Sequence, residues 1–274
     1  MADPARQIRT LFTREFLALI RNARARAMQQ LIPMTKVRQL DIGELVRIIG
    51  LLNTAYIEQP AERLIKENVI RSFTSGIQHT ITDLEEKQPP SKPMEEPLVI
   101  SINFDRSDER AIQNLSNISL SDLKGFTAEM NKKIVRDFVE AEKQGSSVSK
   151  FSAIIQEHYN GIGAGRAEMI ARTASMQAYN EAAWARTKEY APFKEWLPTL
   201  HSERTRPSHL AMEGVIIPVE DAFKVPGFRA SKNTWVEACE MMYPLDSSLG
   251  APAGQIIQCR CSVGGRWTQK GKKK

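Results

Sequence analysis

The stretch RAEMIARTASMQAYNEAAWARTKEY, residues 166–190, decides the fold of this chain. Most of its residues are strong helix formers, and it contains neither glycine nor proline. Pro192 follows closely and disfavours helical backbone at the residue before it. The stretch therefore predicts one long helix from about Arg166 to Tyr190.

Periodic apolar residues on the N-terminal side predict further helices. A first helix starts near Pro4 and carries apolar residues at three- and four-residue steps as far as Ala23. Asp41 is a suitable N-cap for a second helix, and Pro60 can begin a third that ends near Glu86. Together they form a helical hairpin or a small bundle.

The segment QPPSKPMEEP, residues 88–97, predicts a linker and a domain boundary. Four prolines in ten residues block a helix and favour a semi-rigid extended chain. Residues 98–104 alternate between apolar and polar side chains, so they form either a short strand or the lead-in to a helix at Asp105. An all-helical middle follows.

Two shorter helices are predicted in that middle. Ser121 precedes a pattern that Gly145 closes, and Ser149 precedes one that ends at the glycine-rich GIGAG, residues 161–165. Amides at such a loop favour anions, but no hydrophobic strand precedes it and no lysine–serine pair follows it. GIGAG is therefore predicted as a turn between helices.

The composition changes after Pro192. Prolines and glycines punctuate short segments, of which Val215–Val219 and Gln255–Val263 are predicted as strands and the rest as ordered loops. A compact module packed around aromatic side chains is expected, because three of the four tryptophans fall here. These are Trp196, Trp235 and Trp267.

The predicted fold is mainly α, with a helical N-terminal bundle, a long central helix and a C-terminal loop-rich α+β module. The chain divides into an N-terminal helical region, a Pro-rich linker, a helical middle, the compact module and a basic tail. Their residues are 1–87, 88–97, 98–191, 192–266 and 267–274.

The 274 residues are 42% apolar and 26% charged, which excludes a disulfide miniprotein, a collagen-like rod and a wholly disordered chain. No apolar run approaches the roughly 18 residues of a membrane span. No secretory signal is seen, and three cysteines, an odd number, fit a reducing compartment. Folding in a cytoplasm is expected.

The net charge of +6 is unevenly distributed. Residues 1–38 carry eight basic and two acidic side chains, and residues 260–274 carry six basic and no acidic ones. Basic ends suit contact with a polyanion or an acidic partner, or they form a solvated helix face and a solubilising tail. The candidate nucleic-acid-binding residues are Lys270, Lys272, Lys273 and Lys274.

The densest polar cluster is HSERTRPSH, residues 201–209. Its side chains could serve acid–base chemistry, phosphate binding or metal ligation. They could equally pin a loop, since the guanidinium groups of Arg204 and Arg206 each offer five fixed donors to nearby carbonyls. No GxSxG or HExxH motif is present, so the catalytic case rests on composition alone.

Cys259 and Cys261 fall in the last predicted strand. Residues at i and i+2 of a strand face the same way, so their sulfurs converge on one spot, which suits a soft metal ion. Further ligands would come from His209, His201 or Cys239. Structural zinc sites usually place two to four residues between paired cysteines, so buried free thiols are the alternative. A metal here would be structural.

A series of short motifs runs along about residues 98–266. They are ARTxS and AYNEA within 171–182, Trp196, RTRPSH at 204–209, MEG at 212–214, IPVEDAF at 217–223, YP at Tyr243 and CRC at 259–261. In this order they resemble the phage Mu protein F-like minor head, or head morphogenesis, family. RTRPSH followed by CRC is the most specific part of the resemblance.

The resemblance implies a minor capsid component of a tailed bacteriophage that associates with the portal and acts in head assembly, DNA packaging or genome delivery. It implies a virion location, in the capsid interior or at the portal vertex, after assembly in the host cytoplasm. Its partners would be the portal protein, phage DNA and a major capsid or scaffolding protein. It implies no enzymatic activity and no required cofactor.

The motif residues are expected to lock the C-terminal module in place. They are Arg172, Thr173, Asn180, Trp196, Arg204, Thr205, Arg206, His209 and Gly214. Two departures favour this structural interpretation: many members carry a glutamate after Arg-Thr, where this chain has Ala174, and an aspartate shortly before RTR, where it has His201 or Ser202.

The alternative is a metal- or arginine-dependent enzyme acting on nucleic acid or nucleotide. Its pocket would be lined by Arg206, His209, Cys259 and Cys261. A third interpretation, a helical transcription regulator, lacks a short helix-turn-helix.

Overall fold

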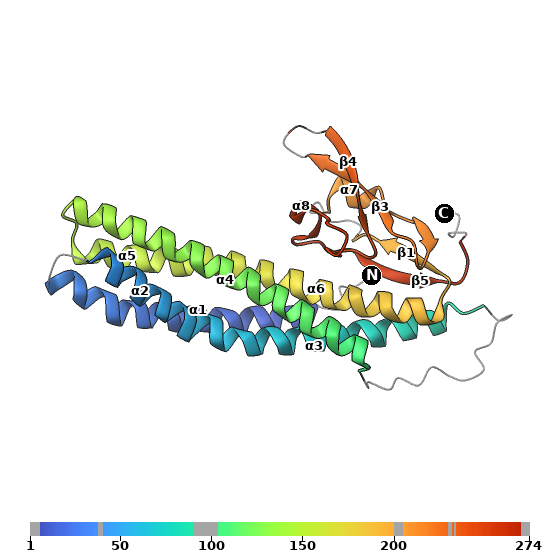
Figure 1. The fold of residues 1–274 in the computed structure, drawn as a ribbon, viewed down its shortest axis with the longest axis horizontal. Coiled ribbons are helices and arrows are strands. Elements are labelled where there is room, and N and C mark those ends of the chain that lie inside the picture. The colour runs from blue at the N-terminus through green and yellow to red at the C-terminus, as the bar shows by residue number, and fades with distance from the viewer. Residues whose placement is uncertain are drawn as a thin grey trace. The chain divides into compact units, whose positions relative to one another are not determined.

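The computed structural model describes residues 6–37, 41–89, 104–199, 205–229, 232 and 234–269. Figure 1 shows a mainly helical chain with small antiparallel sheets near its C-terminus, which confirms the predicted fold class. The helices are α1 (Arg6–Val37), α2 (Ile42–Asn53), α3 (Gln59–Glu86), α4 (Arg106–Lys143), α5 (Val148–Glu157), α6 (Gly163–Tyr190), α7 (Pro207–Leu210) and α8 (Ala253–Ile256). The strands are β1 (Phe193–Leu197), β2 (Ile216–Pro218), β3 (Phe223–Arg229), β4 (Thr234–Met241) and β5 (Ser262–Arg266).

Contacts divide the chain into two compact units that do not follow chain order. The strand unit comprises the described parts of Met1–Ile8, Val69–Leu115 and Arg172–Lys274. The helical unit comprises those of Arg9–Asn68 and Ser116–Ala171. Most of the predicted linker lies outside the described residues, and the chain-order domain boundaries stay a prediction. No described helix combines the length and the apolar character needed to cross a membrane.

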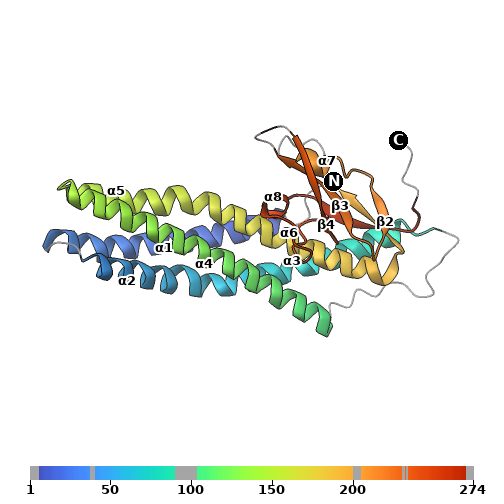
Figure 2. The ribbon, with the colours of Figure 1, turned by 45° about the horizontal axis from the view of Figure 1, so that its top comes forward.

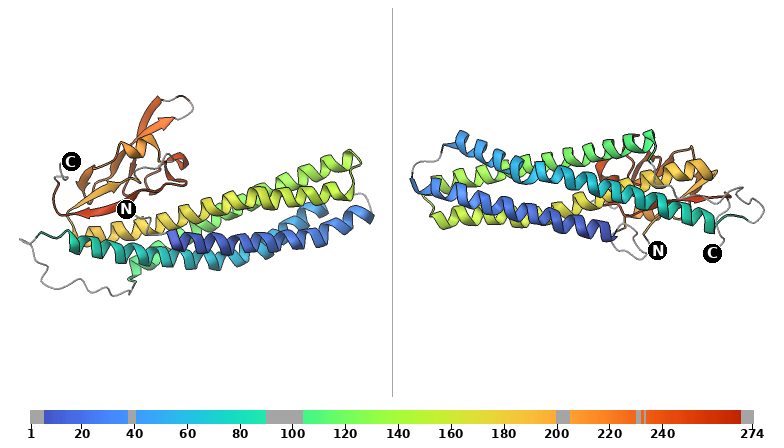
Figure 3. Two further views of the ribbon diagram at one scale, coloured as in Figure 1. Left: turned by 180° about the vertical axis from the view of Figure 1, so that it is seen from behind. Right: turned by 90° about the horizontal axis from the view of Figure 1, so that it is seen from below.

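The helical unit packs by apolar faces at helical spacing. The first helix buries Phe12, Phe16 and Ile20, as its three- and four-residue steps predict. Asp41 caps α2 by accepting a hydrogen bond from the Glu44 amide at 3.0 Å, which confirms the predicted cap. Figures 2 and 3 show the helices of this unit running alongside one another.

Two short π-helical turns join consecutive helices of this chain. Turn η1 (Thr54–Glu58) joins α2 to α3, and turn η2 (His158–Ile162) joins α5 to α6. The helix predicted from Pro60 to about Glu86 is confirmed as α3, which begins at Gln59 and which η1 joins to α2 without a break. The turn predicted at GIGAG is wrong, because η2 continues directly into α6.

A buried polar contact links the segments beside these two turns. Asn53 is fully buried and accepts a hydrogen bond from the Tyr159 hydroxyl at 2.7 Å, and it donates to Asn131. Burial raises the pKa of Tyr159 well above its ordinary value, so this hydroxyl stays a donor. The contact fixes the register of three helical segments, because each amide and hydroxyl would otherwise lose its partner.

The predicted helix boundary at Ser121 is also wrong. Residues 106–143 form one helix, α4, that ends before Gly145, whose φ is +63°. The apolar spacing continues without interruption across the predicted boundary, from Leu115 to Leu123 and Phe126, all of them buried. Burial of this face stabilises one continuous helix. Ser121 could act as a cap only if a helix began there.

The strand unit contains two small antiparallel sheets. One has the order β2–β1–β5, with Phe193 paired to both Pro218 and Arg266, and the other is the hairpin β3–β4 with a bulge between Val225 and Gly227. The strand predicted at Val215–Val219 is confirmed as β2. Strands β1, β3 and β4 were expected as loops, which is wrong: Pro226 and Gly227 interrupt the pattern of β3, and Pro192 and Pro198 flank β1.

Trp196 lies fully buried in the core of the strand unit. Its ring meets Phe223 edge-on, with centroids 5.3 Å apart. The long helix contributes Met176, Tyr179 and Ala183 to the same core, at the spacing of one helix face. The other predicted aromatic anchors differ: Trp267 donates to the Leu84 carbonyl at 3.3 Å, whereas Trp235 is exposed.

Lys194 is buried in this unit and gives a testable pH dependence. Its Nζ donates to the Met242 carbonyl at 2.7 Å and lies over the rings of Trp184 and Phe223. Burial lowers its pKa to about 8, whereas the unfolded chain keeps the ordinary value of 10.5. Between these values the unfolded state binds more protons, so stability rises with pH.

The wild type is compared with the Lys194→Met variant. We expect the difference between their free energies of unfolding, wild type minus variant, to increase from pH 7.5 to pH 10. Urea unfolding at each pH, followed by tryptophan fluorescence, measures this difference. All four tryptophans lie in the strand unit, so the signal reports on that unit. A difference that stays constant or falls over this range contradicts the assigned pKa.

Candidate metal centre

Three side chains with metal-binding donor atoms meet inside the strand unit. His209 Nδ1 lies 3.3 Å from Cys259 Sγ and 3.4 Å from Cys261 Sγ, and the three donor atoms lie within 4.8 Å of one another. Each residue is only 1% exposed. These three residues form the Cys–His cluster. Of the other proposed donors, Cys239 is not part of it, and His201 lies outside the described residues.

The sulfurs converge as the sequence predicts, but not because of a strand. Residues 255–263 were expected to be extended, whereas α8 ends at Ile256 and β5 begins only at Ser262. Gln258 adopts a left-handed backbone with φ of +59°, which turns the chain between the two elements. The two thiols therefore project to one side from a turn, and the Cys261 amide itself points at Cys259 Sγ, 3.4 Å away.

Gln255 determines which nitrogen of the His209 ring carries the proton. Its Nε2 donates to the Pro226 carbonyl at 3.0 Å, so its Oε1 is the atom that faces His209 Nε2 at 2.8 Å. The same oxygen accepts a hydrogen bond from the Ser208 hydroxyl at 3.2 Å. An oxygen that accepts requires a proton on His209 Nε2, which leaves the lone pair of Nδ1 directed at the two sulfurs.

The two thiols have opposite acidities. Burial acts to raise the pKa of Cys259, but a hydrogen bond from the Cys261 thiol, with the His209 ring close by, holds that pKa well below its ordinary value. The hydrogen bond to Cys259 and burial both raise the pKa of Cys261. Cys259 is thus the thiol that loses a proton first, and a thiolate is the form that binds a metal ion.

The long helix holds the segment that carries the two cysteines. Asn180 Nδ2 donates to the Cys261 carbonyl at 3.0 Å, and Asn180 Oδ1 accepts from the Val263 amide at 3.0 Å. About two turns before it, Thr173 Oγ1 accepts from the Gln258 amide at 3.2 Å. These side chains satisfy backbone groups that no sheet partner reaches, so they fix the segment against α6.

A second set of contacts ties the RTRPSH segment to the same place. The Thr205 hydroxyl donates to the Thr199 carbonyl, and the Thr199 hydroxyl donates to the Arg260 carbonyl, both at 2.7 Å. Arg206 Nη2 donates to the Ile257 carbonyl at 2.5 Å. His209 follows within α7, so these contacts set its distance from the cysteines.

Of the remaining predicted motif residues, Trp196 borders the cluster, Arg172 and Gly214 are not among its donors, and Arg204 lies beyond the described part of the chain. Arg172 is buried on α6, and Gly214, with φ of +74°, forms the left-handed turn before β2. Trp196 packs edge-on against the His209 ring, with centroids 5.4 Å apart. Arg204 and the four lysines of residues 270–274 lie outside the described residues.

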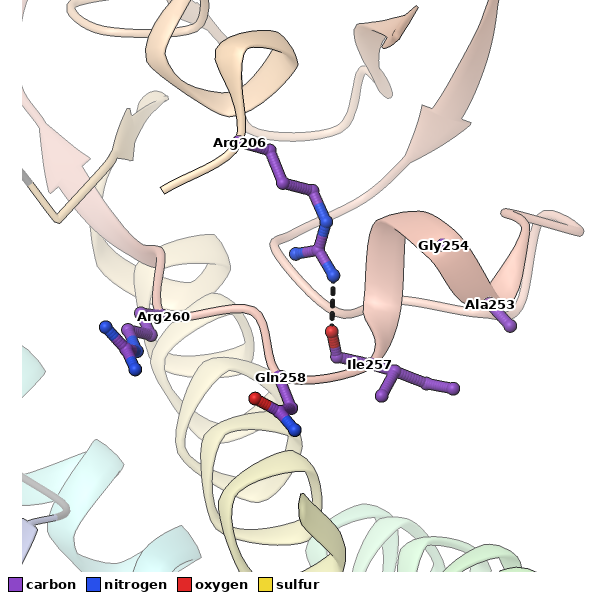
Figure 4. A pocket seen from close by; sticks show the side chains of 6 residues that line it. All are labelled: Arg206, Ala253, Gly254, Ile257, Gln258 and Arg260. Carbon is purple, nitrogen blue, oxygen red and sulfur yellow. Dashed lines mark hydrogen bonds between the residues drawn. The ribbon is translucent and has the colours of Figure 1, made fainter. Parts of the chain in front are cut away.

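An open pocket of about 410 Å³ lies at the surface of this segment. Figure 4 shows Arg206 directed across it at the Ile257 carbonyl. Its lining residues are Arg206, Ala253, Gly254, Ile257, Gln258 and Arg260. Of the four residues that the enzyme alternative requires, only Arg206 lines this pocket or a second one of about 320 Å³ beside Ser208.

Comparison with known proteins gives one match. A family model described as Phage Mu protein F like protein matches residues 132–264. The matched range contains α6, the strands β1 to β4, the first half of β5 and the whole Cys–His cluster. No curated protein and no solved structure matches the chain.

Proposed function

The chain belongs to the Phage Mu protein F-like family through residues 132–264, and we propose on this basis that it is a minor head component of a tailed bacteriophage that associates with the portal. Its role is in head assembly, DNA packaging or genome delivery, and it acts without enzymatic chemistry. The family match is the observation that carries the proposal. The proposal includes a virion location, in the capsid interior or at the portal vertex.

The architecture of the strand unit supports a structural role. The motif residues Thr173, Asn180, Thr205 and Arg206 direct their polar atoms at backbone groups of neighbouring segments. Catalytic side chains instead face a site where substrate can bind. In the described part of the chain, the three donors of the Cys–His cluster are shielded from solvent. This favours a rigid module over the enzyme alternative.

Co-expression with the portal protein of the same phage tests the portal association. We expect a complex that survives size-exclusion chromatography, with few copies of this chain per portal ring at a fixed ratio. The portal protein of an unrelated phage is the control and is expected not to bind. Absence of a complex with the cognate portal at micromolar concentrations would contradict the portal role.

The basic tail gives a prediction about DNA. Replacement of Lys270, Lys272, Lys273 and Lys274 by glutamine is expected to weaken binding to duplex DNA of any sequence. Each lost phosphate contact lowers the slope of log K against log salt concentration by about 0.9, so the slope should fall by up to about 4. Fluorescence anisotropy from 50 to 200 mM salt measures it. Unchanged affinity at low salt would remove the tail from DNA binding.

A further inference from the structure

The Cys–His cluster brings together donors that the chain separates by about fifty residues. His209 comes from α7, whereas Cys259 and Cys261 come from the turn before β5. Buried thiols usually pack as small apolar groups, with no need for a shared polar partner. Here both sulfurs instead meet the same ring nitrogen, at 3.3 and 3.4 Å.

We propose that His209 Nδ1, Cys259 Sγ and Cys261 Sγ bind one zinc ion. Two thiolates and one imidazole are ligands that zinc prefers. A sulfur at about 2.3 Å and a nitrogen at about 2.0 Å from a tetrahedral zinc ion lie about 3.5 Å apart. The observed sulfur–nitrogen distances differ from this by about 0.2 Å or less, so an ion can enter with little movement of the side chains.

The contacts behind His209 have the form expected around a metal ligand. A histidine that binds a metal through one nitrogen almost always donates its other N–H to an acceptor that orients the ring. Gln255 Oε1 is that acceptor, and its own amide is anchored to the Pro226 carbonyl. The ring is thus oriented with Nδ1 as the free donor atom before any ion is present.

The ion has a structural role. The three ligands are almost fully buried, and neither described pocket is lined by any of them. Zinc would link α7 to the turn before β5 and so stabilise the module that also contains β1, β2 and β5. Within the described residues no fourth histidine, cysteine or carboxylate joins the cluster, so the protein supplies three of the four positions of a tetrahedral ion and the fourth is left for another donor such as water. It does not depend on the portal role.

Metal content of the full-length protein tests the proposal directly. Purified from zinc-supplemented cells, the wild type is expected to contain about one zinc per chain by elemental mass spectrometry. Cys239→Ser is the matched control, because Cys239 is a free thiol outside the cluster. It should keep the zinc, whereas Cys259→Ser, Cys261→Ser and His209→Ala should each lose most of it.

Cobalt substitution separates ligation from mere folding. Cobalt bound by thiolates absorbs strongly through sulfur-to-metal charge transfer, and each single cysteine variant should lose at least about half of this band. Gln255→Ala keeps all three ligands and is expected to bind cobalt 10- to 100-fold more weakly. Circular dichroism and tryptophan fluorescence show which variants remain folded.

The proposal is overturned if folded wild type contains no zinc after purification or refolding with equimolar zinc. It is also overturned if the cobalt complex lacks the charge-transfer band, or if folded Cys259→Ser and Cys261→Ser proteins keep their full zinc content.

Discussion

Asn180→Ala is expected to lower the free energy of unfolding of the strand unit by about 3–4 kcal/mol. Asn180 is fully buried and bonds two backbone groups at once, the Cys261 carbonyl and the Val263 amide. Alanine would leave both groups buried without a partner, and each unsatisfied group costs about 1–3 kcal/mol. Urea unfolding followed by tryptophan fluorescence measures the loss.

Gln177→Ala is the matched comparison on the same helix. Gln177 is also buried but bonds only one backbone group, the Leu245 carbonyl, at 3.2 Å. Its replacement is expected to cost about 1–2 kcal/mol, which is less than the effect at Asn180. If the two variants lose equal stability, or if Asn180→Ala loses under 1 kcal/mol, the segment before β5 is held by other contacts.

The helices were predictable because burial repeats along them at a fixed spacing. Phe12, Phe16 and Ile20 are recognisable from their intervals alone, and α6 could be located from composition and Pro192. The π-turns were not predictable, because a turn with one extra residue leaves no mark in residue type. Pro60 correctly signalled the start of α3, whereas nothing in the sequence signalled that η1 joins this helix directly to α2.

The site was predictable only in part. Spacing placed Cys259 and Cys261 together, and composition made His209 one of three possible further ligands. The choice among them depends on how α7 folds against the turn at Gln258, a long-range contact that no local pattern records. Gln255 was missed for the same reason, since an amide becomes a histidine partner only through tertiary position.

Gly76→Ala has the second large expected effect, because α3 and α6 approach closely within the strand unit. A Cβ atom at Gly76 would lie 2.4 Å from the Tyr179 carbonyl oxygen and 2.9 Å from the Ala182 Cβ. The first obstacle is backbone, so no side-chain rotation can relieve it and the helices must separate. Overpacking of this kind costs about 1–3 kcal/mol, despite the better helix propensity of alanine.

The direction of the stability change on glycine-to-alanine replacement distinguishes a close backbone contact from the general cost of a flexible glycine inside a helix. Gly125 also lies inside a helix, α4, but a Cβ there would meet nothing within 4 Å. Gly125→Ala is therefore expected to stabilise the helical unit by up to about 1 kcal/mol. Thermal unfolding followed by circular dichroism should give opposite shifts of the midpoint. If Gly76→Ala also raised the midpoint, Gly76 would not mark a backbone contact, and the helices would have room for a methyl group between them.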